Sequence, residues 1–129
     1  MTAISSEALA RRIATLADSK KAEEVVILDM RGLVAYTDFL AICTARNERQ
    51  ARAVLDEVRV QVKAETGLVP SGSDRGGEAD WVILDYLDAV LHVFTTEARD
   101  RYQLEDLWRE APRLELDLDA PEAPSAASA

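Results

Sequence analysis

The fold class is decided by the stretch FLAICTARNERQARAVLDEVRVQVKAETG, residues 39–67. Its first seven residues are almost continuously apolar, which is typical of a strand covered on both faces. From residue 47 onward, apolar side chains recur every three or four positions, which predicts a helix. Asn47 with Gln50 resembles a capping box, and Gly67 stands where a C-cap belongs. The stripe expected to face the core holds Ala51, Val54, Leu55, Val58 and Val62.

The same signals divide the rest of the chain into further elements, which alternate in a way that a strict βαβ protein would not show. Apolar periodicity, capping residues and glycine or proline mark their limits. The order predicts an α/β protein with a mixed β-sheet flanked by helices. The first half is expected to begin with a helix over 5–24, capped by Ser5 or Ser6, and a central strand over 25–32. The second half is expected to hold a short edge strand over 68–72, a hairpin over 80–94 and an extra edge strand or packed tail over 111–118. Between the hairpin and this last segment we expect a helix over 95–110, capped by Thr95 or Thr96 and anchored by Leu104, Leu107 and Trp108.

Length and composition indicate one globular domain. The chain has 129 residues, of which 48% are hydrophobic and 30% charged, and this is enough to bury a core. We predict a single domain over 1–118 and a disordered tail rich in Ala, Pro and Ser over 119–129. Neither a signal-peptide pattern nor an apolar run of about 20 residues is present, so we expect a cytoplasmic protein without a membrane segment. Cys43, the one cysteine, is expected to be a buried thiol.

The charge is divided unevenly between the two halves of the chain. Residues 1–67 carry ten acids and ten bases, whereas residues 68–129 carry fourteen acids and five bases, a net charge of −9. This argues against binding to DNA or another phosphate backbone, which requires clustered Lys and Arg. An acidic half suits a basic protein partner, and it also serves solubility alone.

Three aspartates and the only histidine within residues 80–94 raise the question of a metal or catalytic site. Zinc requires several nitrogen or sulfur ligands, and His92 stands alone. Asp85 and Asp88 are three positions apart, so they do not share a strand face as a metal-binding carboxylate pair would. We find no phosphate-binding, dinucleotide-binding or nucleophile-elbow motif. We therefore expect no cofactor, no metal and no enzyme activity, with a metal-dependent nucleotidyltransferase using Asp85 and Asp88 as the alternative.

Read as a hairpin, residues 80–94 have two different faces. With a turn over 85–88, Trp81 is expected to pair with His92 and Ile83 with Val90. Val82, Leu84, Ala89, Leu91 and Val93 then form an aliphatic core face. The other face is either a docking surface for a partner or is simply covered by a helix. It holds Trp81, Ile83, Val90 and His92, with Asp85 and Asp88 at its rim.

Taken together, several motifs resemble the ribosomal silencing factor family, also called the iojap family. They are KKAEEVVILDMRG at 20–32, TDFLAICTA at 37–45, RQ at 49–50, DWVILDY with DAVLHVF at 80–94, and RDRYQLEDLW at 99–108. Their order and spacing span about residues 5–110. Two positions depart from the family pattern, because Ala45 and Leu87 stand where glycine is usual. Since leucine avoids positive φ, we expect a different turn type or a wider loop at Leu87.

The resemblance implies a fold similar to the nucleotidyltransferases but without their catalytic carboxylates. It implies a non-enzymatic protein that binds the large ribosomal subunit through universal ribosomal protein fourteen and blocks joining of the small subunit. Translation would then fall when nutrients are limiting. A self-associating adaptor, and hence a homodimer, is the further alternative. The partner-binding residues expected are Trp81, Ile83, Asp85, Asp88, Val90, His92 and Leu104, while Tyr102 and Trp108 could equally belong to the core and Asp38 is expected to be structural.

Overall fold

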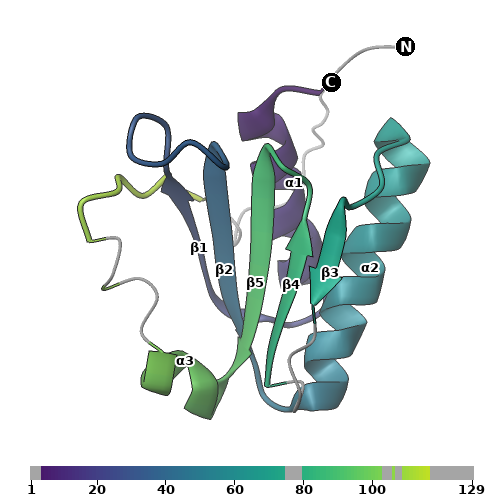
Figure 1. Ribbon diagram of the computed structural model, residues 1–129. Helices are drawn as coiled ribbons and strands as arrows, with labels where there is room; N and C mark the ends of the chain where they lie inside the picture. Colours follow the sequence, from purple (N-terminus) through teal and green to yellow (C-terminus); the bar gives the residue numbers. More distant parts are fainter. Residues whose placement is uncertain (1–3, 75–79, 103–105, 107–108, 117–129) are drawn as a thin grey trace.

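A computed structural model describes residues 4–74, 80–102, 106 and 109–116 (Figure 1). The described strands form one five-stranded sheet in the order β1-β2-β5-β4-β3. The α/β class and the predicted order of helices and strands are confirmed. The elements are α1 (Ser6–Ser19), β1 (Glu23–Asp29), β2 (Phe39–Ala45), α2 (Glu48–Thr66), β3 (Gly72–Asp74), β4 (Trp81–Asp85), β5 (Ala89–Thr95) and α3 (Thr96–Tyr102).

The sheet is mixed, as predicted. β2 and β5 run parallel at its centre, whereas every other neighbouring pair is antiparallel. α1 and α2 pack on one face, α1 against β1, β2 and β5 and α2 against β2, β4 and β5. α3 lies at the foot of the sheet in Figure 1, beside the end of β5. None of the described helices is long and apolar enough to cross a membrane.

α2 forms as its sequence predicts. The Asn47 side chain accepts a hydrogen bond from the Gln50 amide at 2.8 Å, and Gly67 ends the helix in the left-handed conformation with φ of 80°. The capping is not fully reciprocal, because the Gln50 side chain accepts from the Arg46 amide instead of from Asn47. The five stripe residues predicted to face the core are the five buried ones.

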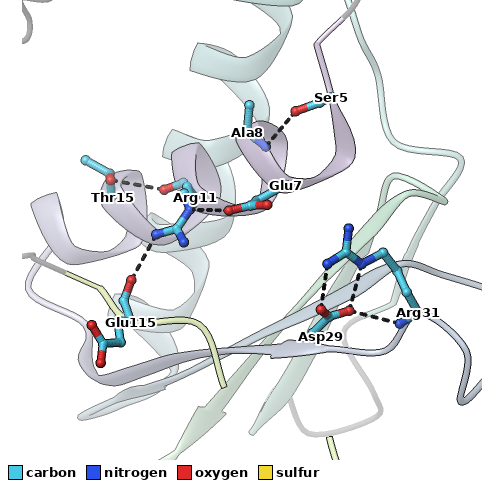
Figure 2. Close-up of polar contacts among 8 residues, drawn as sticks. All are labelled: Ser5, Glu7, Ala8, Arg11, Thr15, Asp29, Arg31 and Glu115. Atoms are coloured by element: carbon cyan, nitrogen blue, oxygen red, sulfur yellow. Dashed lines mark hydrogen bonds and ion pairs between the residues drawn. The ribbon is translucent and has the colours of Figure 1, made fainter. Parts of the chain in front are cut away.

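α1 begins as expected but ends earlier. Ser5 caps it by accepting from the Ala8 amide at 3.1 Å (Figure 2). The helix stops at Ser19 instead of residue 24, because the chain turns there through Lys21 with a φ of 69° and enters β1 at Glu23.

β1 is an edge strand and not the central strand that its apolar run predicted. Two other segments shield its apolar residues from solvent: α1 packs on one face of the strand, and residues 112–114 lie along its outer edge. The Asp29 amide donates to the Pro112 carbonyl at 2.7 Å, and the Leu114 amide donates to Ile27 at 2.9 Å. A single bridge pairs Leu28 with Arg113, and Arg11 of α1 donates to the Glu115 carbonyl (Figure 2). The described part of the 111–118 segment is therefore a packed tail.

One further boundary differs from prediction. The short edge strand is Gly72–Asp74 and not 68–72, because pairing with β4 begins only after Pro70. α3 is described over Thr96–Tyr102, with the Thr95 hydroxyl accepting from the Ala98 amide at 3.4 Å. Buried Arg99 fixes this helix to the sheet by donating to Thr44 and to the Glu24 carbonyl. The predicted anchors Leu104, Leu107 and Trp108, and the tail over 119–129, lie outside the described residues.

The core has two parts, one on each face of the sheet. The larger fills the space between the sheet and helices α1 and α2. The smaller lies on the opposite face, where residues of β1, β2 and β5 meet Ala98 of α3 and Ala111. Cys43 is fully buried, as predicted, and burial raises its thiol pKa to about 12. It is therefore a packing residue and not a nucleophile.

Candidate docking surface

The β4–β5 hairpin carries the predicted surface, but its register differs from our expectation. Trp81 pairs with Phe94 and Ile83 pairs with His92, so each pairing is shifted by two residues from the predicted one. The reason is the position of the turn, which lies one residue later than predicted at the same length: Tyr86 and Ala89 close it with a backbone hydrogen bond of 2.9 Å, where Asp85 and Asp88 were expected to close it. A shift of two leaves every side chain on its predicted face, since the strand period is two.

One face of the hairpin belongs to the core. Its aliphatic side chains are almost completely buried under α1 and α2, as predicted. Tyr86 extends this face beyond the predicted set, and burial raises its pKa to about 12. The buried members are Val82, Leu84, Tyr86, Ala89, Leu91 and Val93.

The opposite face, which we call the open face, contains Trp81, Ile83, Val90 and His92. Trp81, Ile83 and His92 are half-buried, whereas Val90 is buried. Trp81 and Ile83 pack at the margin of the smaller core cluster. In Figure 1 the described chain places α3 at the foot of the sheet and no other helix in front of β4 and β5. The face therefore lies between core and surface, with apolar side chains that reach solvent.

Trp81 and His92 contact each other directly. The indole Nε1–H of Trp81 donates to Nδ1 of His92 at 3.0 Å, and the two rings lie 5.9 Å apart. Trp81 also stacks on Phe94 with ring centres 4.9 Å apart. An imidazole nitrogen that accepts a hydrogen bond carries no proton, so His92 is neutral here with its proton on Nε2. Burial lowers the pKa of His92 to about 4, although nearby Asp85 opposes this shift.

The two aspartates at the rim serve the turn. The Asp85 carboxylate accepts from the Leu87 amide at 2.8 Å, and the Asp88 amide donates to the Tyr86 carbonyl at 2.8 Å, which closes a three-residue γ-turn. Leu87 at its centre has a φ of 72°. Our expectation of a wider loop was wrong, because only Leu87 and Asp88 join Tyr86 to Ala89 and Leu87 itself adopts a positive φ.

The remaining predicted positions divide into two groups. The backbone of Asp38 holds the start of β2, since its carbonyl accepts from Met30 and its amide donates to Asp88. This agrees with the structural role that was expected. Leu104 and Trp108 lie outside the described residues, and Tyr102 ends α3. Sequence reasoning missed Phe94, although alternation along β5 from His92 would have placed it on the same face.

Within the described parts of the chain, no group of three or more His, Cys, Asp or Glu side chains could hold a metal ion. A cavity of about 770 Å³ lies at the other end of the sheet, beside the starts of α2 and α3. Three arginines and three acids line it, and Arg101 contacts Asp80 at 3.3 Å, so its charges balance. The cavity adjoins the Trp81 end of the hairpin and contains none of the predicted surface residues; it is lined by Arg46, Asn47, Glu48, Arg49, Asp80, Thr95, Thr96, Glu97 and Arg101.

Comparison with known proteins identifies the family. The model of a family described as "Ribosomal silencing factor during starvation" matches residues 3–129. The chain belongs to the ribosomal silencing factor family. Its members are regulators and not enzymes. The resemblance inferred from the sequence motifs is confirmed.

Relatives match over most of the chain. The ribosomal silencing factor of Halalkalibacterium halodurans is 37% identical over 114 residues, which cover 88% of this chain and 97% of that protein. The Bacillus subtilis factor is 36% identical over 81% of this chain and 87% of its own length. The chloroplastic Iojap protein of Arabidopsis thaliana is 32% identical over 86% of this chain but only 46% of its own length.

Solved structures share the fold. A Bacillus halodurans crystal structure with 38% identity superimposes with a TM-score of 0.69, covering 81% of this chain and 95% of that one. A Chromobacterium violaceum crystal structure with 24% identity has a TM-score of 0.78, covering 93% of this chain and 100% of that one. The sheet and its helices are therefore the family architecture.

Proposed function

We propose that this protein binds the large ribosomal subunit through universal ribosomal protein fourteen and sterically blocks joining of the small subunit. Translation in the cytoplasm would thereby be repressed under nutrient limitation. The observation that carries the proposal is the open face within a chain of this family: half-buried Trp81, Ile83 and His92, with Asp85 and Asp88 at the rim. An apolar centre with a polar rim is the usual anatomy of a protein interface.

The charge and chemistry of the open face fit steric blocking. Blocking requires only a stable complex at the right place, so neither a metal nor a nucleophile is needed. The acidic second half of the chain, with its net charge of −9, suits the basic surface common among ribosomal proteins. Asp85 and Asp88 provide part of this charge beside the aromatic pair, and complementary charge speeds encounter with such a partner.

The proposal is tested with purified subunits. Large subunits are incubated with the protein, small subunits are added, and joining is followed by light scattering, while co-sedimentation measures binding. We expect wild-type protein to sediment with large subunits and to reduce joining. Trp81→Ala should weaken binding by about 2 kcal/mol or more, as truncation of an interface anchor usually does.

The matched control for this test is Val60→Ala, an exposed apolar residue on the outer face of α2. It should bind and block like the wild type. A thermal unfolding curve for each variant separates lost binding from lost structure. If wild-type protein stays at the top of the gradient at low salt, the proposed function is wrong.

A further inference from the structure

Large hydrophobic side chains that are well exposed gather at one end of the sheet. Among the described residues there are six, and five of them lie in three loops at that end. The loops are the β1–β2 connection, the segment between α2 and β3, and the β4–β5 turn, all at the top of Figure 1. The sixth, Val60, lies on α2. We call the five together the apolar rim: Leu33, Tyr36, Leu68, Val69 and Leu87.

Backbone hydrogen bonds tie these loops to one another. The amides of Asp38 and Phe39 donate to the Asp88 carbonyl at 3.2 and 3.3 Å, which joins the β1–β2 connection to the hairpin turn. The Ser71 amide donates to the Asp85 carbonyl at 2.7 Å, which joins the third loop to β4. Since Asp85 also borders the open face, the apolar rim continues that face over the end of the sheet. Five strands about 4.8 Å apart give this edge a width of roughly 19 Å.

Leu87 is the member of the rim that folding explains least. Its side chain is 59% exposed and its φ is 72°, a conformation that costs a leucine strain and a glycine none. Burial of this side chain therefore cannot offset the strain. Exposed Lys21 and Glu24 also have positive φ, so Leu87 differs from them in placing an apolar side chain in solvent at such a position. The chain keeps an apolar side chain at the tip of the hairpin at the expense of its own stability.

The open face alone exposes less surface than a stable protein interface covers. Val90 is buried, and Trp81, Ile83 and His92 are half-buried. A stable protein interface covers about 800 Å² on each partner, which is more than three half-buried side chains expose.

The charges around the apolar rim indicate the kind of partner that it fits. Asp38, Asp85 and Asp88 stand among its loops, whereas Arg31 is paired with Asp29 at 2.7 Å (Figure 2).

We propose that the apolar rim, led by Leu87 and Tyr36, anchors a basic protein of the large ribosomal subunit that the open face also contacts. This inference rests on the proposed function and adds the residues that hold the partner. Exposed apolar side chains between carboxylates fit a partner surface with apolar pockets surrounded by Lys and Arg.

The test compares two substitutions of equally exposed residues. Leu87→Asn removes the apolar side chain but keeps the turn, since asparagine tolerates positive φ. Val60→Asn makes the same kind of change at a residue that is 57% exposed on α2. Binding of each full-length variant to purified large subunits is measured by co-sedimentation across a concentration series. We expect Leu87→Asn to weaken binding at least tenfold, Tyr36→Ser with Leu87→Asn to weaken it further, and Val60→Asn to match the wild type.

Each result decides between this inference and its alternatives. If Trp81→Ala loses binding while Leu87→Asn retains it, the proposed function stands and the apolar rim is not part of the interface. If wild-type protein does not bind large subunits, both proposals are overturned. A third result would be concentration-dependent dimers, seen by light scattering, that Leu87→Asn dissolves without changing subunit binding. That result would assign the rim to a second copy of this chain and would overturn the ribosomal partner.

Discussion

The two faces of the β4–β5 hairpin differ in burial although they alternate along the same fifteen residues. On one face, Leu84, Leu91 and Val93 are covered by α1 and α2 and are at most 1% exposed. On the other, Trp81, Ile83 and His92 remain half-buried. Side chains on the covered face stabilise the fold, whereas those on the open face can still lose solvent contact when a partner binds. Strand alternation alone therefore separates side chains that stabilise the fold from those that we propose for recognition.

The largest expected effect tests the covered face. Leu91→Ala should lower the free energy of unfolding by about 3 kcal/mol, because it removes buried methyl groups and leaves a cavity. Trp81→Ala should cost less than this, since its side chain is only half-buried. Urea unfolding followed by circular dichroism measures both. Equal losses for the two variants would mean that the faces do not differ in their contribution to stability.

An intermediate effect tests the buried character of His92. Its pKa is lowered to about 4 in the folded state, against an ordinary value of 6.5. The unfolded chain therefore binds a proton more readily as pH falls, so stability should decrease between about pH 6.5 and pH 4, with no contribution above that range. The slope from this one group is at most about 1.4 kcal/mol per pH unit.

His92 is the only histidine, so a single set of ring proton signals in an NMR titration reports its pKa directly. His92→Gln is the control, because glutamine can still accept from Trp81 and does not titrate in this range. Its stability should lack the part of the slope that His92 supplies in the wild type. A titration midpoint near 6.5 would show that the His92 ring is as exposed to solvent as a histidine on an ordinary protein surface.

The smallest expected effect has the opposite sign. Leu87→Gly should raise the free energy of unfolding by about 1 kcal/mol, because glycine adopts positive φ without the strain that leucine suffers. Part of this gain is offset by the greater backbone freedom of glycine in the unfolded state. Urea unfolding at pH 7 checks it, with Val60→Gly as a control that should be destabilising in a helix. A stability loss at Leu87 would mean that its side chain contributes to packing after all.

Local pattern predicted much of the fold. The stripe of α2, its caps at Asn47 and Gly67, and the limits of β2 followed from periodicity and capping chemistry, which act within a few residues. The two faces of the hairpin were also predicted, because strand alternation survived a register error of two residues. The strong family resemblance came from the order of motifs, none of which is specific by itself.

Other features depended on contacts between distant segments, which periodicity cannot show. β1 reads as a central strand because it is apolar, but it lies at an edge of the sheet. Helix α1 buries one of its faces, and residues 112–114 form hydrogen bonds with its outer backbone edge. The hydrogen bond between Trp81 and His92 and the stack on Phe94 required the actual register. The apolar rim required three loops, separated by up to about fifty residues of sequence, to meet at one end of the sheet.

The sequence by itself therefore determined the class of fold, the family and the division of the hairpin into a covered face and an open face. Tertiary structure alone decided that the Asp85 carboxylate holds a turn, that Leu87 occupies a strained conformation, and that exposed apolar side chains extend the open face. The physical reason is the distance along the sequence over which each effect acts. Propensity and alternation act between near neighbours in sequence, whereas burial and register are fixed only when remote strands pack.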